Sequence, residues 1–150
     1  MNIKTIRTNS KNKDFINLVK ELDAYLKITD EDEHDFYNQF NSIDVLKEVV
    51  VTYVDKVAVG CAAIKKIDNT VVEVKRMFVL KENRGSGVAQ KLLHELEGWA
   101  IELGYTKCVL ETGIRQIGAL EFYKKCTYKV TSNYGQYIGM KNSVCFEKEI

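Results

Sequence analysis

The chain has 150 residues, of which 45% are hydrophobic and 29% are charged, and its formal net charge is +1. The length fits one domain, expected over residues 1–150, and the composition excludes a disordered chain, a collagen-like repeat and a bundle of membrane helices. The near balance of basic and acidic residues gives no electrostatic reason to expect binding to nucleic acid or to an anionic membrane.

The N-terminal third predicts one strand and two helices. A strand is expected over Ile3–Arg7 and a helix over Phe15–Leu26, where apolar residues recur at steps of three and four. Asn12 or Ser10 can cap the start of this helix with a side-chain oxygen. After an acidic segment, the aromatic residues within Phe36–Phe40 favour a short second helix.

The middle of the chain changes from strand patterns to a helix pattern. Runs rich in β-branched residues predict strands over Val49–Val54, Val57–Ile64 and Val71–Val79, joined by short polar turns. Helical spacing of apolar residues then predicts a helix over Val88–Leu103. Gly104 follows it, at the position where a residue in the left-handed conformation commonly ends a helix.

The last third predicts three short strands and one helix. The strands are expected over Cys108–Leu110, Tyr128–Thr131 and Val144–Glu147, and the helix over Ala119–Cys126. Together with the earlier elements, this order predicts a mixed sheet with helices on its faces.

The loop between the strand ending at Val79 and the helix beginning near Val88 carries the clearest functional signal. It reads Arg84-Gly85-Ser86-Gly87-Val88-Ala89, and its two glycines let backbone amides approach a ligand without a Cβ in the way. The helix that starts there directs unpaired N–H groups and the positive end of its dipole into the loop. This arrangement suits a phosphate group, although a plain turn without a ligand fits the same residues.

Two phosphate-binding folds can be compared with this loop. A P-loop is excluded, because it requires Gly-Lys-Ser/Thr and Gly87 is followed by Val88. A dinucleotide-binding fold would place Gly85 and Gly87 after a strand, and an acid such as Glu111 at the end of the next strand. Gln90 stands at its third glycine position, however, and the preceding strands form a meander, so this fold is the less favoured alternative.

The loop and its flanks resemble the GNAT superfamily of N-acetyltransferases. Arg84, Gly87 and Ala89 match the first, fourth and sixth positions of its signature Q/R-x-x-G-x-G/A. Glu73–Val79 looks like the strand that precedes the signature in small bacterial members, and Leu110–Gly113 resembles the strand that follows it.

A second match lies in the C-terminal third. Gln116-x-x-Ala119-x-x-x-Tyr123 resembles the N-x-x-A-x-x-x-Y helix of the family, with Gln116 where Asn is commoner. Thr127 stands where a glycine in the left-handed conformation normally ends this helix. Tyr134-Gly135-Gln136-Tyr137 looks like a block of one branch of small members, and its tyrosines could line an acceptor pocket or pack in the core.

The resemblance implies an α/β fold with a mixed, mostly antiparallel seven-stranded sheet, helices on both faces and a splayed central strand pair. It also implies an enzyme that moves an acetyl group from acetyl-CoA to the primary amine of a small acceptor. Direct attack in a ternary complex is expected, since no well-placed nucleophile suggests a covalent intermediate. The alternative from another class is a non-catalytic acyl-CoA-binding sensor on the same fold.

The resemblance also assigns residues to acetyl-CoA. The backbone at the end of the strand before the loop would pair with the pantetheine arm as an added strand. The loop amides would hold the pyrophosphate, with the Arg84 side chain as a charge partner. The cofactor-binding candidates are Phe78, Val79, Arg84, Gly85, Ser86, Gly87, Val88, Ala89 and Gln116.

Two proton transfers need residues of their own. The acceptor must react as a neutral amine, and deprotonating an amine with a pKa near 10.4 at pH 7 costs roughly 4–5 kcal/mol. Glu73, on the strand expected to line the cleft, is the candidate base, and Glu111 is the second choice. The departing thiolate needs a proton, and Tyr123 matches the tyrosine to which the family gives this role.

The cysteines bear on metal binding and on compartment. Cys61, Cys108, Cys126 and Cys145 are too far apart in sequence for a C-x-x-C pair or a zinc pattern, so no metal is expected. Free thiols favour a cytoplasmic protein, and no apolar run suits a signal peptide or a membrane span. Pairing through the C-terminal strands, which is common in folds of this kind, leaves a homodimer open.

Overall fold

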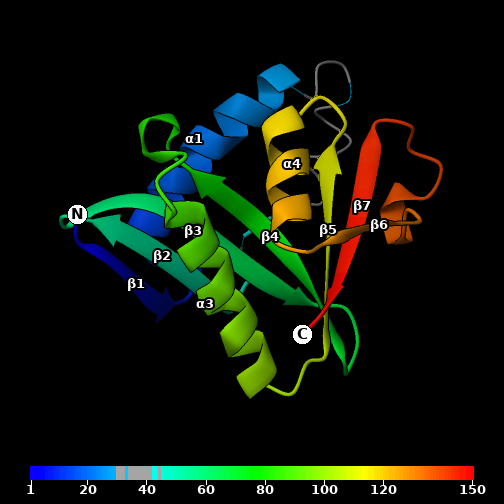
Figure 1. Ribbon diagram of the computed structural model, residues 1–150, viewed down its shortest axis with the longest axis horizontal. Helices are drawn as coiled ribbons and strands as arrows, with labels where there is room; N and C mark the ends of the chain where they lie inside the picture. Colours follow the sequence, from blue (N-terminus) through cyan, green and yellow to red (C-terminus); the bar gives the residue numbers. More distant parts are fainter. Residues whose placement is uncertain (30–32, 34–41, 44) are drawn as a thin grey trace.

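The computed structural model of the protein describes residues 1–29, 33, 42, 43 and 45–150. In this part of the chain, seven strands form a sheet in the order β1-β2-β3-β4-β5-β7-β6 (Figure 1). The strands are β1 (Ile3–Thr8), β2 (Glu48–Val54), β3 (Val57–Lys66), β4 (Val71–Val79), β5 (Lys107–Gly113), β6 (Lys129–Thr131) and β7 (Ser143–Glu149). The helices are α1 (Lys13–Thr29), α3 (Val88–Glu102) and α4 (Ile117–Lys125), with the short 3₁₀ turns η2 (Lys81–Asn83) and η3 (Gly135–Tyr137).

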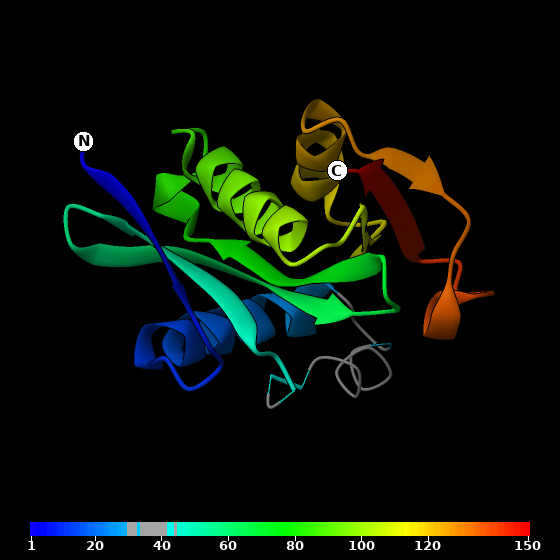
Figure 2. The same ribbon diagram turned by 90° about the horizontal axis from the view of Figure 1, so that it is seen from below.

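The predicted fold class is confirmed. Neighbouring strands of the described sheet are antiparallel except β4 and β5, which run parallel. Helix α1 covers one face of the sheet, and α3 and α4 cover the other (Figure 2). The dinucleotide-binding alternative is wrong for this chain, because that fold requires a mostly parallel sheet. The helix predicted within Phe36–Phe40 lies outside the described residues.

Both faces of the sheet are packed because the central strands alternate between two apolar clusters. On β2, Val49 and Val51 belong to the cluster that contains Phe15 of α1, whereas Val50 belongs to the cluster that contains Leu92 of α3. All five side chains are fully buried. This period of two is that of a strand, and it fixes the sheet between its two helical layers.

The helix ends follow the capping signals in the sequence, with one exception. The Asn12 side-chain oxygen accepts a hydrogen bond of 2.9 Å from the backbone N–H of Phe15, so the predicted cap of α1 is confirmed. Gly104, with φ +96°, ends α3 as expected. After α4, Thr127 itself adopts φ +69°, which a β-branched residue rarely does. The chain therefore makes the exit expected of a glycine, at a cost in backbone strain.

The sheet opens between its two central strands. Residues Val71–Glu73 of β4 pair with Lys107–Val109 of β5, and the register pairing ends there. Beyond this point β4 continues to Val79 and β5 to Gly113 as separate strands. The predicted splay is thus confirmed, and it leaves one edge of β4 open inside the molecule.

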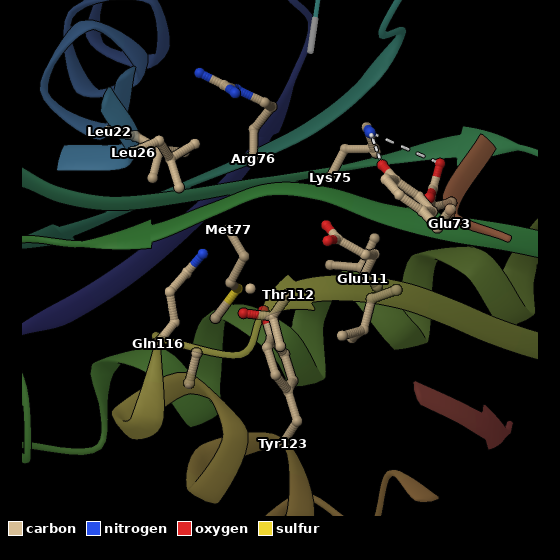
Figure 3. A pocket seen from close by; sticks show the side chains of 15 residues that line it. Leu22, Leu26, Glu73, Lys75, Arg76, Met77, Glu111, Thr112, Gln116 and Tyr123 are labelled. Atoms are coloured by element: carbon tan, nitrogen blue, oxygen red, sulfur yellow. Dashed lines mark hydrogen bonds and ion pairs between the residues drawn. The ribbon is translucent and has the colours of Figure 1, made fainter. Parts of the chain in front are cut away.

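A β-bulge interrupts β4 next to this opening. Cys61 of β3 faces Phe78 and Ala63 faces Lys75, so two residues of β4, Arg76 and Met77, stand opposite Ala62 alone. Arg76 takes φ +56°, and its guanidinium forms an ion pair with Asp23 of α1. The extra residue brings Lys75 and Arg76 to the same side of β4, whereas Met77 extends to the opposite side (Figure 3).

Candidate active site

A cleft of about 390 Å³ lies where β4 ends and where α3 and α4 begin. Met77, Phe78 and Val79 line it from β4, and Arg84, Gly85 and Ala89 line it from the loop and the first turn of α3. Gln116, Gly118, Ala119, Phe122 and Tyr123 line it from the α4 side. The structure therefore brings together residues from all three segments that the sequence assigned to a cofactor.

The two glycines of the loop have left-handed backbone and open space around them. Gly85 and Gly87 have φ of +77° and +86°, and a Cβ added to either would meet nothing within 4 Å. Helix α3 begins at Val88, so the N–H groups of Val88, Ala89 and Gln90 have no carbonyl partner inside the helix. Left-handed backbone before a helix N-terminus is a geometry that binds phosphate groups.

Two side chains fix this loop, one of them against the end of β4. The Arg84 Nε donates to the backbone oxygen of Val79 at 3.0 Å, and the guanidinium lies 5.9 Å from the ring centres of Tyr25 and Phe78. The Ser86 hydroxyl donates to the Asn83 carbonyl at 2.6 Å. Both residues were expected to contact the cofactor, and the structure gives them contacts that also fix the loop.

A second, more polar cavity of about 110 Å³ adjoins the cleft at the opening between β4 and β5 (Figure 3). Its charged lining residues are Glu73, Lys75, Arg76 and Glu111. Five residues line both the cavity and the cleft: Leu22, Met77, Gln116, Ala119 and Tyr123. A molecule in the cavity and another in the cleft would therefore meet at this shared wall.

Glu73 is buried, with 2% of its surface exposed. One carboxylate oxygen accepts a hydrogen bond of 2.6 Å from the Tyr134 hydroxyl, and the other lies 3.9 Å from the Lys75 ammonium. Burial lowers the pKa of Lys75, and the charge of Glu73 opposes this shift only in part. Burial, followed by the charge of Glu73, raises the pKa of Tyr134. This hydroxyl therefore stays protonated and is the donor of the hydrogen bond to Glu73.

Glu111, the other candidate base, lies across the opening on β5. Its carboxylate points toward β4, between Lys75 and Met77 (Figure 3). Both carboxylates named from the sequence therefore line one cavity, Glu73 at the last pair between β4 and β5 and Glu111 beyond it.

Tyr123 lies on α4 with 6% of its surface exposed, and it belongs to the wall shared by the cavity and the cleft. Its ring packs edge-on against Tyr128, with the ring centres 5.7 Å apart, and tilted against Phe146 at 6.0 Å. Burial raises the pKa of its hydroxyl well above the ordinary value, so the phenol stays protonated at neutral pH. Gln116 precedes α4 and reaches the same wall from the other end of the motif.

Sequence reasoning missed the contribution of Lys75, Arg76 and Asp23 to this site. Lys75 and Arg76 are adjacent charged residues in a strand that is otherwise rich in apolar side chains. Two consecutive polar residues break the period of two, and this break is the signal that could have indicated the bulge. Asp23 had no such signal, because it joins Arg76 from 53 residues away.

Across the described ranges, no three His, Cys, Asp or Glu side chains gather in a way that could hold a metal ion. None of the helices in these ranges has the length and apolar character needed to cross a bilayer.

Comparison with known sequences identifies relatives over most of the chain. The sequence model described as "Acetyltransferase (GNAT) family" matches residues 15–128. The IAA acetyltransferase of Azospirillum brasilense is 28% identical over 144 residues, which cover 90% of both chains. "Probable N-acetyltransferase 14" of Xenopus tropicalis is 34% identical over 112 residues, which cover 74% of this chain. The present chain spans about half the length of that protein, because the match covers 54% of it.

Comparison with solved structures identifies the same fold. A Klebsiella pneumoniae protein whose name assigns it to the acyl-CoA N-acyltransferases superposes with a TM-score of 0.82 at 26% identity, over 98% of this chain and 97% of that one. The PaiA N-acetyltransferase of Thermoplasma acidophilum, solved with coenzyme A, gives a TM-score of 0.74 at 20% identity over the full length of both. At that lower identity the likeness concerns the fold alone.

Proposed function

Because the chain belongs to the acetyltransferase (GNAT) family, we propose that it transfers the acetyl group of acetyl-CoA to the primary amine of a small acceptor. Residues 1–150 would act as one acyltransferase domain. The observation that carries this proposal is the wall shared by the glycine-loop cleft and the polar cavity, since two substrates must meet for direct transfer. The Azospirillum relative, whose alignment covers 90% of both chains, is named an acetyltransferase, and this supports the same reaction class.

The residues of the cleft fit acetyl-CoA. The edge of β4 that β5 leaves unpaired near Phe78 and Val79 offers backbone groups to an extended arm that carries amides, as an added strand would use them; the Val79 oxygen also accepts a hydrogen bond from Arg84. The loop from Arg84 to Ala89 and the start of α3 suit the pyrophosphate. Gln116 borders the same cleft. Acetyl-CoA supplies the thioester, and the Thermoplasma protein of the same fold was solved with coenzyme A.

Direct attack by the amine is the proposed route, because the cysteines of this chain offer no nucleophile. None of the four lines the cleft or the cavity. Cys61 is fully buried, and burial raises the pKa of its thiol to about 12. A thiol with so high a pKa supplies almost no thiolate at neutral pH.

Glu73 is the proposed base, and Glu111 is the alternative. One Glu73 oxygen is engaged by Tyr134, while the other faces the more distant Lys75 and can still accept the proton of the amine, directly or through a water molecule. The nitrogen then forms its bond to the acetyl carbon as the bond from carbon to sulfur breaks. Tyr123 gives its proton to the departing sulfur, since burial keeps the phenol protonated at neutral pH, and the second proton that the nitrogen loses on becoming an amide restores it.

Binding of acetyl-CoA by calorimetry tests the assignment of the cleft. Gly87→Asn adds a side chain to the loop proposed to hold the pyrophosphate, and Asn tolerates the left-handed backbone better than other residues. Gly104→Asn is the matched control, because Gly104 has the same conformation and open space at the other end of α3. We expect Gly87→Asn to weaken binding by at least about tenfold and Gly104→Asn to leave it unchanged. Equal affinities in two folded variants would contradict the assignment.

Release of CoA in the presence of amines then tests catalysis. Amine-dependent release by the native protein supports the transferase. If the protein binds acetyl-CoA but releases no CoA with amino acids, polyamines or simple alkylamines, the non-catalytic sensor is favoured instead.

A further inference from the structure

Lys75 is a buried cation whose hydrogen-bonding capacity is only partly used. Its side chain is 7% exposed, and its ammonium has three donors. Among the described residues, its nearest partners are the Tyr137 hydroxyl at 3.5 Å and a Glu73 oxygen at 3.9 Å. A well-formed bond from an ammonium to an oxygen is about 2.7–2.9 Å long. The ammonium therefore has room for a closer anionic partner.

Arg76, the next residue, shows the same deficit. Its side chain is 2% exposed, and one terminal nitrogen is used by Asp23. Within the described part of the chain, its Nε is buried without a hydrogen-bond partner. A buried guanidinium N–H without an acceptor costs free energy, which an incoming anion would remove.

The bulge in β4 brings these two cations to one cavity. Lys75 and Arg76 line it from the same side of β4, and Glu111 lines it from β5 (Figure 3). An acceptor with an ammonium as its sole charge would be attracted by the carboxylates but would leave the spare donors of Lys75 and the buried Nε of Arg76 without an acceptor. An acceptor that also carries an anionic group matches both signs of charge in the cavity.

From these contacts we infer that the acceptor is a small amino acid, whose carboxylate binds Lys75 and Arg76 while its amine faces the wall shared with the cleft. This inference rests on the proposed acetyl transfer. Met77 follows Arg76 on β4 and belongs to that wall, so the amine of a molecule held at Lys75 and Arg76 can face the cleft. The cavity of about 110 Å³ also favours a small molecule.

Matched pairs of amines test the inference. CoA release is measured with glycine, β-alanine and 4-aminobutyrate, and with the corresponding carboxamides, which differ in the anionic group. Rates are expressed per concentration of neutral amine, because a neighbouring carboxylate raises the pKa of the amine. Two charge-assisted hydrogen bonds predict a preference in kcat/KM of roughly 10- to 100-fold for at least one acid over its amide.

Lys75→Met removes the charge at nearly constant length, and Lys66→Met, at an exposed position on β3, is the control. We expect Lys75→Met to lower the preference for the acid about tenfold or more and Lys66→Met to keep it. Lys75→Met leaves the buried Glu73 carboxylate without its cationic neighbour, which costs stability, so thermal unfolding verifies that the variant folds.

The outcomes separate the two proposals. Amides used as well as acids, or a preference unchanged in Lys75→Met, would overturn the carboxylate site while CoA release upholds the transferase. If no amine releases CoA, calorimetry of the three acids in the presence of CoA decides: no binding overturns the inference. Titration of acetyl-CoA in the same samples shows separately whether the cleft binds the cofactor.

Discussion

Asp23→Asn should disturb the bulge of β4 without touching β4 itself. Asp23 lies on α1, and its carboxylate pairs with the guanidinium of Arg76, whose left-handed backbone forms the bulge. The two ends of this pair differ in exposure: the Arg76 side chain is 2% exposed and that of Asp23 is 43% exposed. Replacing the carboxylate by an amide keeps the shape but leaves a buried positive charge with a weaker partner.

The expected loss of stability follows from these exposures. A hydrogen bond to a charged group contributes about 1.5–3 kcal/mol, and water can take over part of the role of a half-exposed carboxylate, so the low end, about 1.5 kcal/mol, applies. A chain of this size loses about 2–4 °C of melting temperature per kcal/mol, which gives a decrease of about 3–6 °C. Because Lys75 and Met77 flank the bulge, kcat/KM should also fall, by about tenfold.

Thermal unfolding and CoA release measure the two effects. Glu21→Gln, at an exposed position on the same helix, is the control for removing one negative charge from α1. If Asp23→Asn has the same melting temperature as Glu21→Gln and keeps full activity, the pairing of β3 with β4 holds the bulge by itself, and the proposed role of α1 is wrong.

Three further substitutions test the site and its supports. Tyr123→Phe should keep the fold and the affinity for acetyl-CoA but lower turnover at least about tenfold. Because burial raises the pKa of the phenol, this loss should persist across neutral pH. Full turnover in the variant would mean that solvent protonates the thiolate. Glu73→Gln should lower turnover most near neutral pH and less as rising pH supplies free amine, whereas the same pH dependence in Glu111→Gln alone would move the role of base to β5. Thr127→Gly should raise the free energy of unfolding in urea by about 0.5–1 kcal/mol, since the left-handed strain of about 1–2 kcal/mol exceeds the entropy cost of a glycine. Thr127→Ala, which keeps the strain, should show no such gain.

The sequence predicts the elements of this fold more reliably than the contacts between them. The bounds Val71–Val79 predicted for β4 agree with the structure, because a run of β-branched residues is a local signal. The bulge within that strand cannot be predicted from the same signal, since one extra residue changes the side of the sheet to which side chains point but not the composition of the strand. The 3₁₀ turn Lys81–Asn83 was also not predicted, as three polar residues fit a loop equally well.

In the site, too, local motifs can be predicted from the sequence and contacts between distant residues cannot. The glycine loop and Tyr123 lie in contiguous motifs, which sequence analysis can detect. The structure places Tyr123 at the cleft and, from the loop motif, Arg84, Gly85 and Ala89, whereas Ser86, Gly87 and Val88 do not line it. The contact between Tyr134 and Glu73 joins residues 61 positions apart, and that between Asp23 and Arg76 joins residues 53 positions apart. Such pairs depend on the packing of η3 and α1 against β4, for which the sequence contains no local pattern.

The separation of β4 from β5 has a thermodynamic consequence. The part of the sheet formed by β1–β4 is joined to the part formed by β5–β7 by three residue pairs between β4 and β5. A ligand in the cleft would contact β4 and α3 on one part and α4 on the other, and would bridge them. At a concentration one hundred times its Kd, such a ligand adds about 2.7 kcal/mol to the free energy of unfolding. Hydrogen exchange at the β4 amides beyond Glu73 would then slow on binding, because occupancy supplies the strand contact that the protein itself omits.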